Sequence, residues 1–264
     1  MVDTDFVDLP SPTTIRQRLE QVTKEDMQMF LKALYLTASS PIELAGELTS
    51  NDRQQGKYSQ GIGPRGNDVF SAEIEMPDQR LDDVLEMLGK IRSKELDLEQ
   101  AEKQLRRKIP VAVFRIKLSR KDVESVKLVA LPMAKEFEPW TEQIYRYYTK
   151  RGNDLVFPFN RQDVWEYIYR KNNIFKGLKY TALMYTHKTP DQFRLRHPAH
   201  TLDFGMQMLR VVRTKELIEK YSFDMLDLTG FVGLAFRLTR MPIELDIPKT
   251  NDYWKRYIKK LCRT

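Results

Sequence analysis

One stretch of the chain reads Val111-Ala112-Val113-Phe114-Arg115-Ile116-Lys117-Leu118, then Ser119-Arg120-Lys121-Asp122, then an apolar run from Val123 to Leu131. Both apolar runs are rich in β-branched residues, and the four residues between them are polar, which is the pattern of a β-hairpin. Cations lie at the predicted tip, at Lys117, Arg120 and Lys121. We therefore expect a small antiparallel sheet with a positively charged turn.

Helical patterns surround this predicted hairpin. Upstream, apolar residues from Met27 to Leu34 recur at helical spacing, and Pro41 suits the first turn of a second helix. Downstream, further helices are predicted at 141–150, after Asn160, over Phe193 to Leu202, around Leu217 and over Leu226 to Leu234, with a β-like run at 180–185. Glycines at positions 56, 61, 63 and 66 predict an exposed loop. The predicted fold class is α+β, mainly α, with a small antiparallel sheet.

The chain shows no internal repeat and no flexible linker, which favours one continuous domain. The predicted lead-in segment spans residues 1–21, and its first part, Met1 to Thr13, holds scattered acids and two prolines and is expected to be loosely ordered. The predicted domain spans residues 22–250. Residues 251–264 predict a basic amphipathic helix, in which Trp254, Tyr257, Ile258 and Leu261 form the apolar face.

Composition excludes several classes of protein. The 264 residues include 44 Lys and Arg against 37 Asp and Glu, and the net charge of +7 favours a polyanionic partner. The chain holds no apolar run of about 20 residues, so we expect no membrane span, and it begins with no apolar leader. A single cysteine, Cys262, excludes an intrachain disulfide framework. We expect a cytoplasmic protein.

Candidate metal ligands are few. His197 and His200 stand three residues apart, a spacing compatible with a metal pair, but only His187 and Cys262 remain as further typical zinc ligands. We therefore expect no metal site and no cofactor.

Five short motifs follow one another along the chain. They read Thr37-Ala38-Ser39-Ser40-Pro41-Ile42-Glu43-Leu44, the basic hairpin, Leu155-Val156-Phe157-Pro158 before Asn160-Arg161-Gln162-Asp163-Val164-Trp165, Phe193-Arg194-Leu195-Arg196-His197, and Leu228-Thr229-Gly230-Phe231-Val232-Gly233-Leu234. Their order resembles that of the catalytic domain of tyrosine recombinases, which include phage-type integrases and their archaeal and bacterial relatives. The resemblance covers about residues 22 to 234 and implies the fold of that domain.

The resemblance also implies a chemistry. In that family a tyrosine attacks a DNA phosphodiester, two arginines and a His or Trp bind the phosphoryl oxygens, and a hairpin lysine protonates the leaving oxygen. The hairpin lysine falls at Lys121, with Lys117 as second choice, and the second arginine and its following histidine fall at Arg196 and His197. The nearest downstream nucleophile is Tyr253.

The other positions depart from the family pattern. Ser40 stands where the first arginine is expected, Phe193 replaces a histidine, and Leu234 replaces the His or Trp. A serine hydroxyl cannot replace a bidentate guanidinium on a phosphoryl oxygen. No tyrosine occurs between Ala235 and Asp246, where the nucleophile is expected. Lys121, Arg196, His197 and Tyr253 are therefore predicted to be a remnant site.

The sequence thus predicts a recombinase-derived protein that binds double-stranded DNA and has little or no strand-transfer activity. The predicted phosphate-binding residues are Lys117, Arg120, Lys121, Arg194 and Arg196. A plainer interpretation remains for each group: the hairpin cations are a solvated turn, and Arg196 and His197 are an ordinary surface pair.

Two further functions remain open. The first is an active DNA breaking and rejoining enzyme that uses Tyr253 or Tyr257 as nucleophile. The second is a protein-interaction module on the same fold, which self-associates through the C-terminal helix at 251–264.

Overall fold

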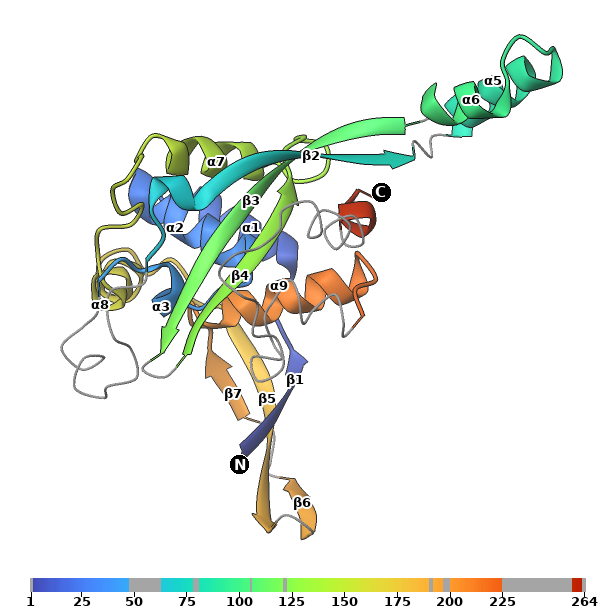
Figure 1. The fold of residues 1–264 in the computed structure, drawn as a ribbon. Helices are drawn as coiled ribbons and strands as arrows, with labels where there is room; N and C mark the ends of the chain where they lie inside the picture. The colour runs from blue at the N-terminus through green and yellow to red at the C-terminus, as the bar shows by residue number, and fades with distance from the viewer. Residues whose placement is uncertain are drawn as a thin grey trace. The chain divides into compact units, whose positions relative to one another are not determined.

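The structure, a computed structural model, describes residues 2–47, 63–77, 81–104, 106–120, 123–189, 192–196, 200–224 and 258–262. Its helices are α1 (Pro12–Glu20), α2 (Glu25–Leu36), α3 (Pro41–Leu44), α5 (Leu81–Arg92), α6 (Leu98–Gln104), α7 (Thr141–Thr149), α8 (Arg161–Trp165) and α9 (Met208–Glu219), with a 3₁₀ turn η1 (Gly66–Asp68) and a π-helix η2 (Glu166–Lys171). Its strands are β1 (Val2–Asp8), β2 (Val69–Pro77), β3 (Arg106–Arg120), β4 (Val123–Pro132), β5 (Lys179–Thr189), β6 (Gln192–Arg196) and β7 (His200–Asp203). Helices and antiparallel strands occur together, which confirms the α+β class (Figure 1).

The chain divides into two compact units, each built from segments that are distant in the sequence. Unit 1 holds Met1–Pro64, Lys117–Glu124 and Leu155–Lys220, and unit 2 holds Arg65–Ile116, Ser125–Asp154 and Tyr221–Thr264. The domain boundaries predicted after residues 21 and 250 stay a prediction.

The core of unit 1 forms around α2. Nine of the twelve residues of this helix are buried, and α2 contacts α1, α3 and α9. Phe30 of α2 meets Phe157 edge-on, with ring centroids 5.2 Å apart. The apolar spacing from Met27 to Leu34 predicted this core helix correctly, because a stripe at helical period has to be buried.

A four-stranded antiparallel sheet completes unit 1. Strand β5 pairs with β1, β6 and β7. Val2 to Asp8 pair with Thr186 to Thr181, so the predicted lead-in begins with a sheet strand, and the following helix α1 buries Ile15 and Leu19. The prediction of a loosely ordered start was therefore wrong. The strand that pairs with residues 2–8 lies about 180 positions further along the chain, so no local sequence pattern reveals this pairing.

Unit 2 contains most of the predicted hairpin. Strands β3 and β4 span Arg106–Arg120 and Val123–Pro132, which confirms the two apolar runs as strands, and β2 pairs with β3 from Val69↔Phe114 to Pro77↔Arg106. Helix α7 contributes Tyr148, whose ring meets Phe114 edge-on at 5.3 Å.

One predicted helix is wrong. Residues 193–202 were expected to be helical, but Gln192–Arg196 form strand β6 and His200–Asp203 form strand β7. Phe193 and Leu195 alternate with Arg194 and Arg196, which is the period of a strand, and Pro198 disfavours a helix that continues past it.

The C-terminal end is helical where it is described, at residues 258–261. Ile258 and Leu261 are buried, and the ammonium of Lys260 donates to the carbonyl oxygen of Ser222 at 3.0 Å. Lys260 also lies 5.9 Å from the centre of the Phe223 ring. This short segment therefore docks within its own unit.

Candidate functional site

The structure describes the predicted phosphate-binding residues only in part. Lys117 and Arg120 lie near the end of β3, and Arg194 and Arg196 lie on β6, where they pair with His187 and Tyr185 of β5. Of these four residues the structure describes the backbone only. All four belong to unit 1.

The remaining predicted site residues lie outside the described residues. These are Lys121, His197, Tyr253 and Tyr257. Whether Lys121, Arg196, His197 and Tyr253 converge on one site therefore stays a prediction.

Ser40, at the position expected for the first arginine, lies at a helix start. Its backbone N–H donates to the Glu43 carboxylate at 2.9 Å, and Glu43 is itself part of α3. This is one half of a capping box, which satisfies a backbone donor that the first helical turn leaves open. This bond uses the backbone of Ser40, which any residue except proline can supply, so it does not require a serine at this position.

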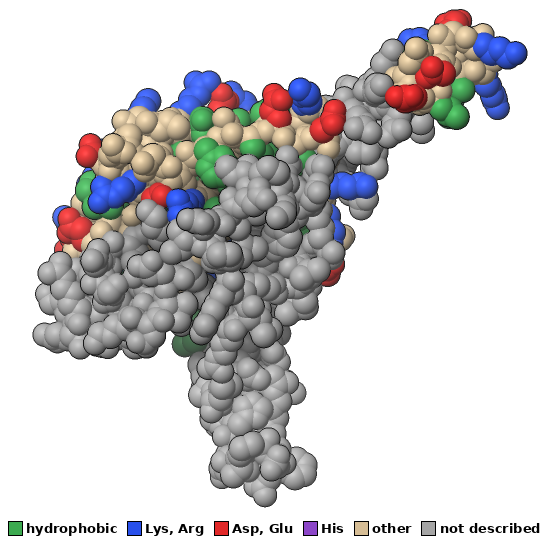
Figure 2. All heavy atoms as spheres, in the orientation of Figure 1, with side chains coloured by type: hydrophobic (Ala, Val, Ile, Leu, Met, Phe, Trp, Pro, Cys, Tyr) green, Lys and Arg blue, Asp and Glu red, His purple; other side chains and the backbone are tan. Residues whose placement is uncertain are grey.

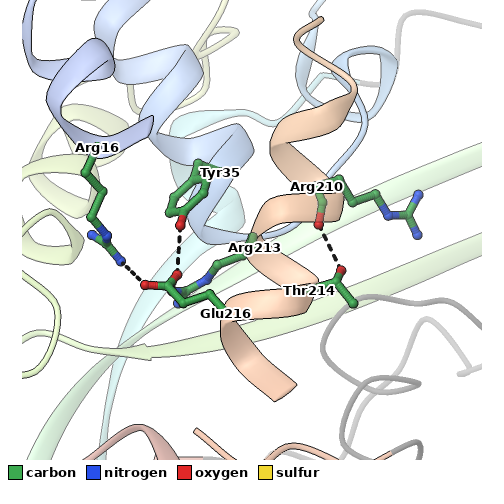
Figure 3. Close-up of polar contacts among 6 residues, drawn as sticks. All are labelled: Arg16, Tyr35, Arg210, Arg213, Thr214 and Glu216. Atoms are coloured by element: carbon green, nitrogen blue, oxygen red, sulfur yellow. Dashed lines mark hydrogen bonds and ion pairs between the residues drawn. The ribbon is translucent and has the colours of Figure 1, made fainter. Parts of the chain in front are cut away.

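A buried ionic cluster joins three helices of unit 1 (Figure 3). Arg213 and Glu216 lie one turn apart on α9, and the Arg213 guanidinium donates to the Glu216 carboxylate. The hydroxyl of Tyr35, on α2, donates to the same carboxylate at 2.8 Å, and Arg16, on α1, reaches its other oxygen at 3.5 Å. One carboxylate therefore connects α1, α2 and α9.

The burial of this cluster changes its acid–base behaviour. Arg213 and Tyr35 are fully buried and Glu216 is 4 % exposed. Burial disfavours the Glu216 anion, but the charges of Arg213 and Arg16 and the hydrogen bonds from Arg213 and Tyr35 outweigh it and hold the pKa of Glu216 below its ordinary value. Burial and the neighbouring Glu216 anion raise the pKa of Tyr35 well above its ordinary range. Glu216 is therefore an anion and Tyr35 a neutral donor at neutral pH.

The Tyr35 ring also faces both cations. The guanidinium carbons of Arg16 and Arg213 lie 5.3 and 5.6 Å from the ring centre, within the range of cation–π attraction. The cluster thus combines ion pairs, a hydrogen bond and aromatic contacts. It fixes α9 against α1 and α2, and nothing in its geometry presents a reactive group to solvent.

Arg210 lies one turn before Arg213 on α9 and points away from the Glu216 carboxylate (Figure 3). Its carbonyl oxygen accepts a hydrogen bond from the Thr214 hydroxyl at 2.8 Å. The sequence predicted a helix around Leu217, which α9 confirms, but not the buried cluster that this helix contributes to. An available signal was the arginine and glutamate three residues apart at 213 and 216, but their burial depends on α1 and α2.

The described residues hold no group of three or more His, Cys, Asp or Glu side chains placed to bind a metal ion. His197 lies outside the described residues, and of His200 only the backbone is described. Within the described part of the chain no helix combines the length and the apolar character that crossing a membrane requires.

Comparison with known proteins found no family model, no curated protein and no solved structure that matches this chain.

Proposed function

We propose that this chain binds double-stranded DNA, derives from a tyrosine recombinase and has little or no strand-transfer activity. Support comes from the order of motifs, from the helix pair α2 and α3, and from the β3–β4 hairpin that follows. The net charge of +7 favours a polyanion.

The observation that carries the proposal is the β5–β6 ribbon. Residues 179–196 hold Lys179, Lys188, Arg194 and Arg196 against Asp191, a net charge of 4 − 1 = +3 without His187. Arg194 is paired with His187 and Arg196 with Tyr185. Because paired and alternate positions share one face of a ribbon, basic positions 187, 194 and 196 lie on one face. Strand β1 pairs with β5 up to Val2↔Thr186 and sets Asp3 opposite Tyr185, so the two-stranded part, which has the width that fits the major groove of DNA, begins at His187 and carries Arg194.

A second position is available for the arginine of the H-x-L-R-H signature. The signature was expected on a helix, but residues 192–196 form a strand. Gln207-Met208-Leu209-Arg210-Val211 keeps the Leu-Arg pair and opens helix α9. In this placement the buried pair of Arg213 and Glu216 fixes the helix that carries Arg210. The proposal then includes Arg210 as a further phosphate-binding residue.

The binding test compares an Arg194→Ala/Arg196→Ala double variant with an Arg146→Ala control. Arg146 lies on α7 with its side chain 71 % exposed and pairs with Glu142, so the control removes one surface charge that does not belong to the ribbon. We expect the double variant to lose about tenfold or more in affinity for duplex DNA and to lower the salt slope by about two. The control should bind like the wild type, and equal losses in both variants would contradict the ribbon's role.

The enzymatic alternative has a separate test. A suicide DNA substrate traps a covalent intermediate if a tyrosine attacks the phosphodiester. We expect no adduct with the wild-type chain. An adduct that disappears in Tyr253→Phe or Tyr257→Phe would show an active recombinase and overturn the second half of the proposal.

A further inference from the structure

Trp165 is a large aromatic side chain that unit 1 leaves 38 % exposed. It ends α8 and is followed directly by the π-helix η2. The centre of its ring lies 5.5 Å from that of Tyr169, whose hydroxyl accepts a hydrogen bond from the backbone N–H of Met206 at 2.8 Å. Trp165 therefore has a neighbour that is itself anchored, while more than a third of its own surface faces solvent.

The π-helix accounts for the position of Arg170 over this ring. In an α-helix of about 3.6 residues per turn, side chains five positions apart point about 140° away from each other. The i→i+5 geometry of a π-helix brings such positions together, and π-turns occur frequently at functional sites. The guanidinium carbon of Arg170 accordingly lies 5.3 Å from the centre of the Trp165 ring. This cation–π contact orients Arg170 and leaves its charge in place.

Two more cations follow Arg170. Lys171 ends η2, and Lys176 lies in the turn after it. The backbone N–H of Ile174 donates at 3.1 Å to a carbonyl oxygen of η2, so this turn folds back onto the π-helix. All three cations are exposed. We call these three cations and Trp165 the η2 patch.

Acidic side chains do not compensate the charge of the η2 patch. From Tyr167 to Pro190 the sequence contains no Asp or Glu. Among the residues that the structure describes, the three cations form no ion pair. The arm of α5 and α6 in unit 2 differs: residues 81–104 hold 4 basic and 7 acidic side chains, which are interspersed in Figure 2, and Lys90 pairs with Glu86. The η2 patch therefore attracts anions, whereas the arm does not.

The exposed indole indicates which polyanion fits the η2 patch. A duplex keeps its base faces stacked inside the helix, where a ring on a protein surface cannot reach them. A single strand offers its base faces. Sites for single strands combine cations along the backbone with aromatic rings on which bases stack, and arginine adds cation–π attraction. The η2 patch contains each of these parts.

We propose that the η2 patch binds single-stranded nucleic acid. A base stacks on the exposed part of Trp165, and the flanking phosphates lie against Arg170, Lys171 and Lys176. Because Arg170 is oriented by the indole, its N–H groups are placed in advance for a phosphate oxygen. This inference does not depend on the binding of duplex DNA.

The first experiment measures the affinity of the full chain for a labelled oligonucleotide of about 12 thymidines by fluorescence anisotropy. Trp165→Leu removes the stacking surface but keeps an apolar side chain, and we expect a loss of about tenfold. Trp165→Phe keeps an aromatic face and should bind within about threefold of the wild type. The control is Ile218→Ala, at a residue of α9 that is 47 % exposed, and it should bind like the wild type.

The second experiment tests the phosphate contacts. Arg170→Gln/Lys171→Gln removes two cations and should lower the salt slope for the same oligonucleotide by about 1.4. Lys90→Gln/Lys94→Gln removes the same charge from the arm of α5 and α6 and should leave the slope unchanged.

Four results would each overturn the proposal. They are a wild-type chain that does not bind the oligonucleotide, a Trp165→Leu variant that binds it as tightly as the wild type, equal changes of slope in the two double variants, and an equal loss of Trp165→Leu on a duplex of the same length. The last result would place Trp165 in duplex binding instead.

Discussion

Glu216 is the residue on which the packing of α9 depends most. Its carboxylate accepts hydrogen bonds from Arg213 and Tyr35, and Arg213 is fully buried. Replacing Glu216 with Gln leaves the Arg213 charge uncompensated, and we expect the free energy of unfolding to fall by about 3 kcal/mol. Urea denaturation measures this loss.

The matched control lies on the same helix. Glu219 pairs with Lys215 at 3.7 Å with both side chains well exposed, so Glu219→Gln should change stability by less than about 0.5 kcal/mol. Similar losses in the two variants would mean that the buried cluster contributes no more than a surface pair.

The lowered pKa of Glu216 predicts an acid dependence of stability. Its folded pKa lies below the ordinary value of 4.5, so the folded state binds this proton less readily than the unfolded state does. The stabilisation is present above pH 4.5 and is lost as pH falls through the folded pKa. We expect Glu216→Gln to flatten the acid limb of a stability-versus-pH curve. An unchanged slope would show that other carboxylates cause the loss.

At the scale of elements, the end of α3 depends on two glycines. A Cβ at Gly46 would lie 2.5 Å from the carbonyl oxygen of Phe157, and one at Gly63 would lie 2.3 Å from the Cα of Gly46. The amide of Gly46 donates to that same carbonyl at 3.0 Å. The chain segments therefore approach more closely here than any side chain permits.

Gly46→Ala should destabilise unit 1 by about 2 kcal/mol or more, because the backbone has to shift. Gly89, in the middle of α5, has nothing within 4 Å of an added Cβ. Gly89→Ala should stabilise by about 0.5 to 1 kcal/mol through helix propensity. Thermal unfolding of both variants measures the difference, and a tolerated Gly46→Ala would contradict the close approach.

Elements with a local signal could be predicted from sequence. Apolar residues at helical spacing predicted α2, and the alternating apolar runs predicted β3 and β4. The position of Asn160 before Val164 and Trp165 predicted the N-cap of α8. Elements that form only because a distant segment pairs with them could not be predicted from sequence. Strand β1 exists because β5 pairs with it. Gly63 is buried and lies against Gly46, although its sequence neighbourhood predicts an exposed loop.

The candidate site, too, could be predicted from sequence only in part. The positions of the basic residues could be read from sequence, whereas the helix expected around Arg196 proved to be a strand. The buried cluster of Arg16, Tyr35, Arg213 and Glu216 draws on residues 200 positions apart. Only the packing of α1, α2 and α9 reveals it.

At the scale of the whole molecule, a single titration tests the proposal that the positive charge of the chain holds DNA phosphates. The measurement is the affinity for a labelled duplex as a function of salt. The six proposed phosphate-binding residues, Arg210 included, predict a slope of log K against log salt of about −5.4, or about an 1,800-fold loss of affinity between about 50 and 200 mM. Binding that is absent, or that does not change with salt, would contradict the account.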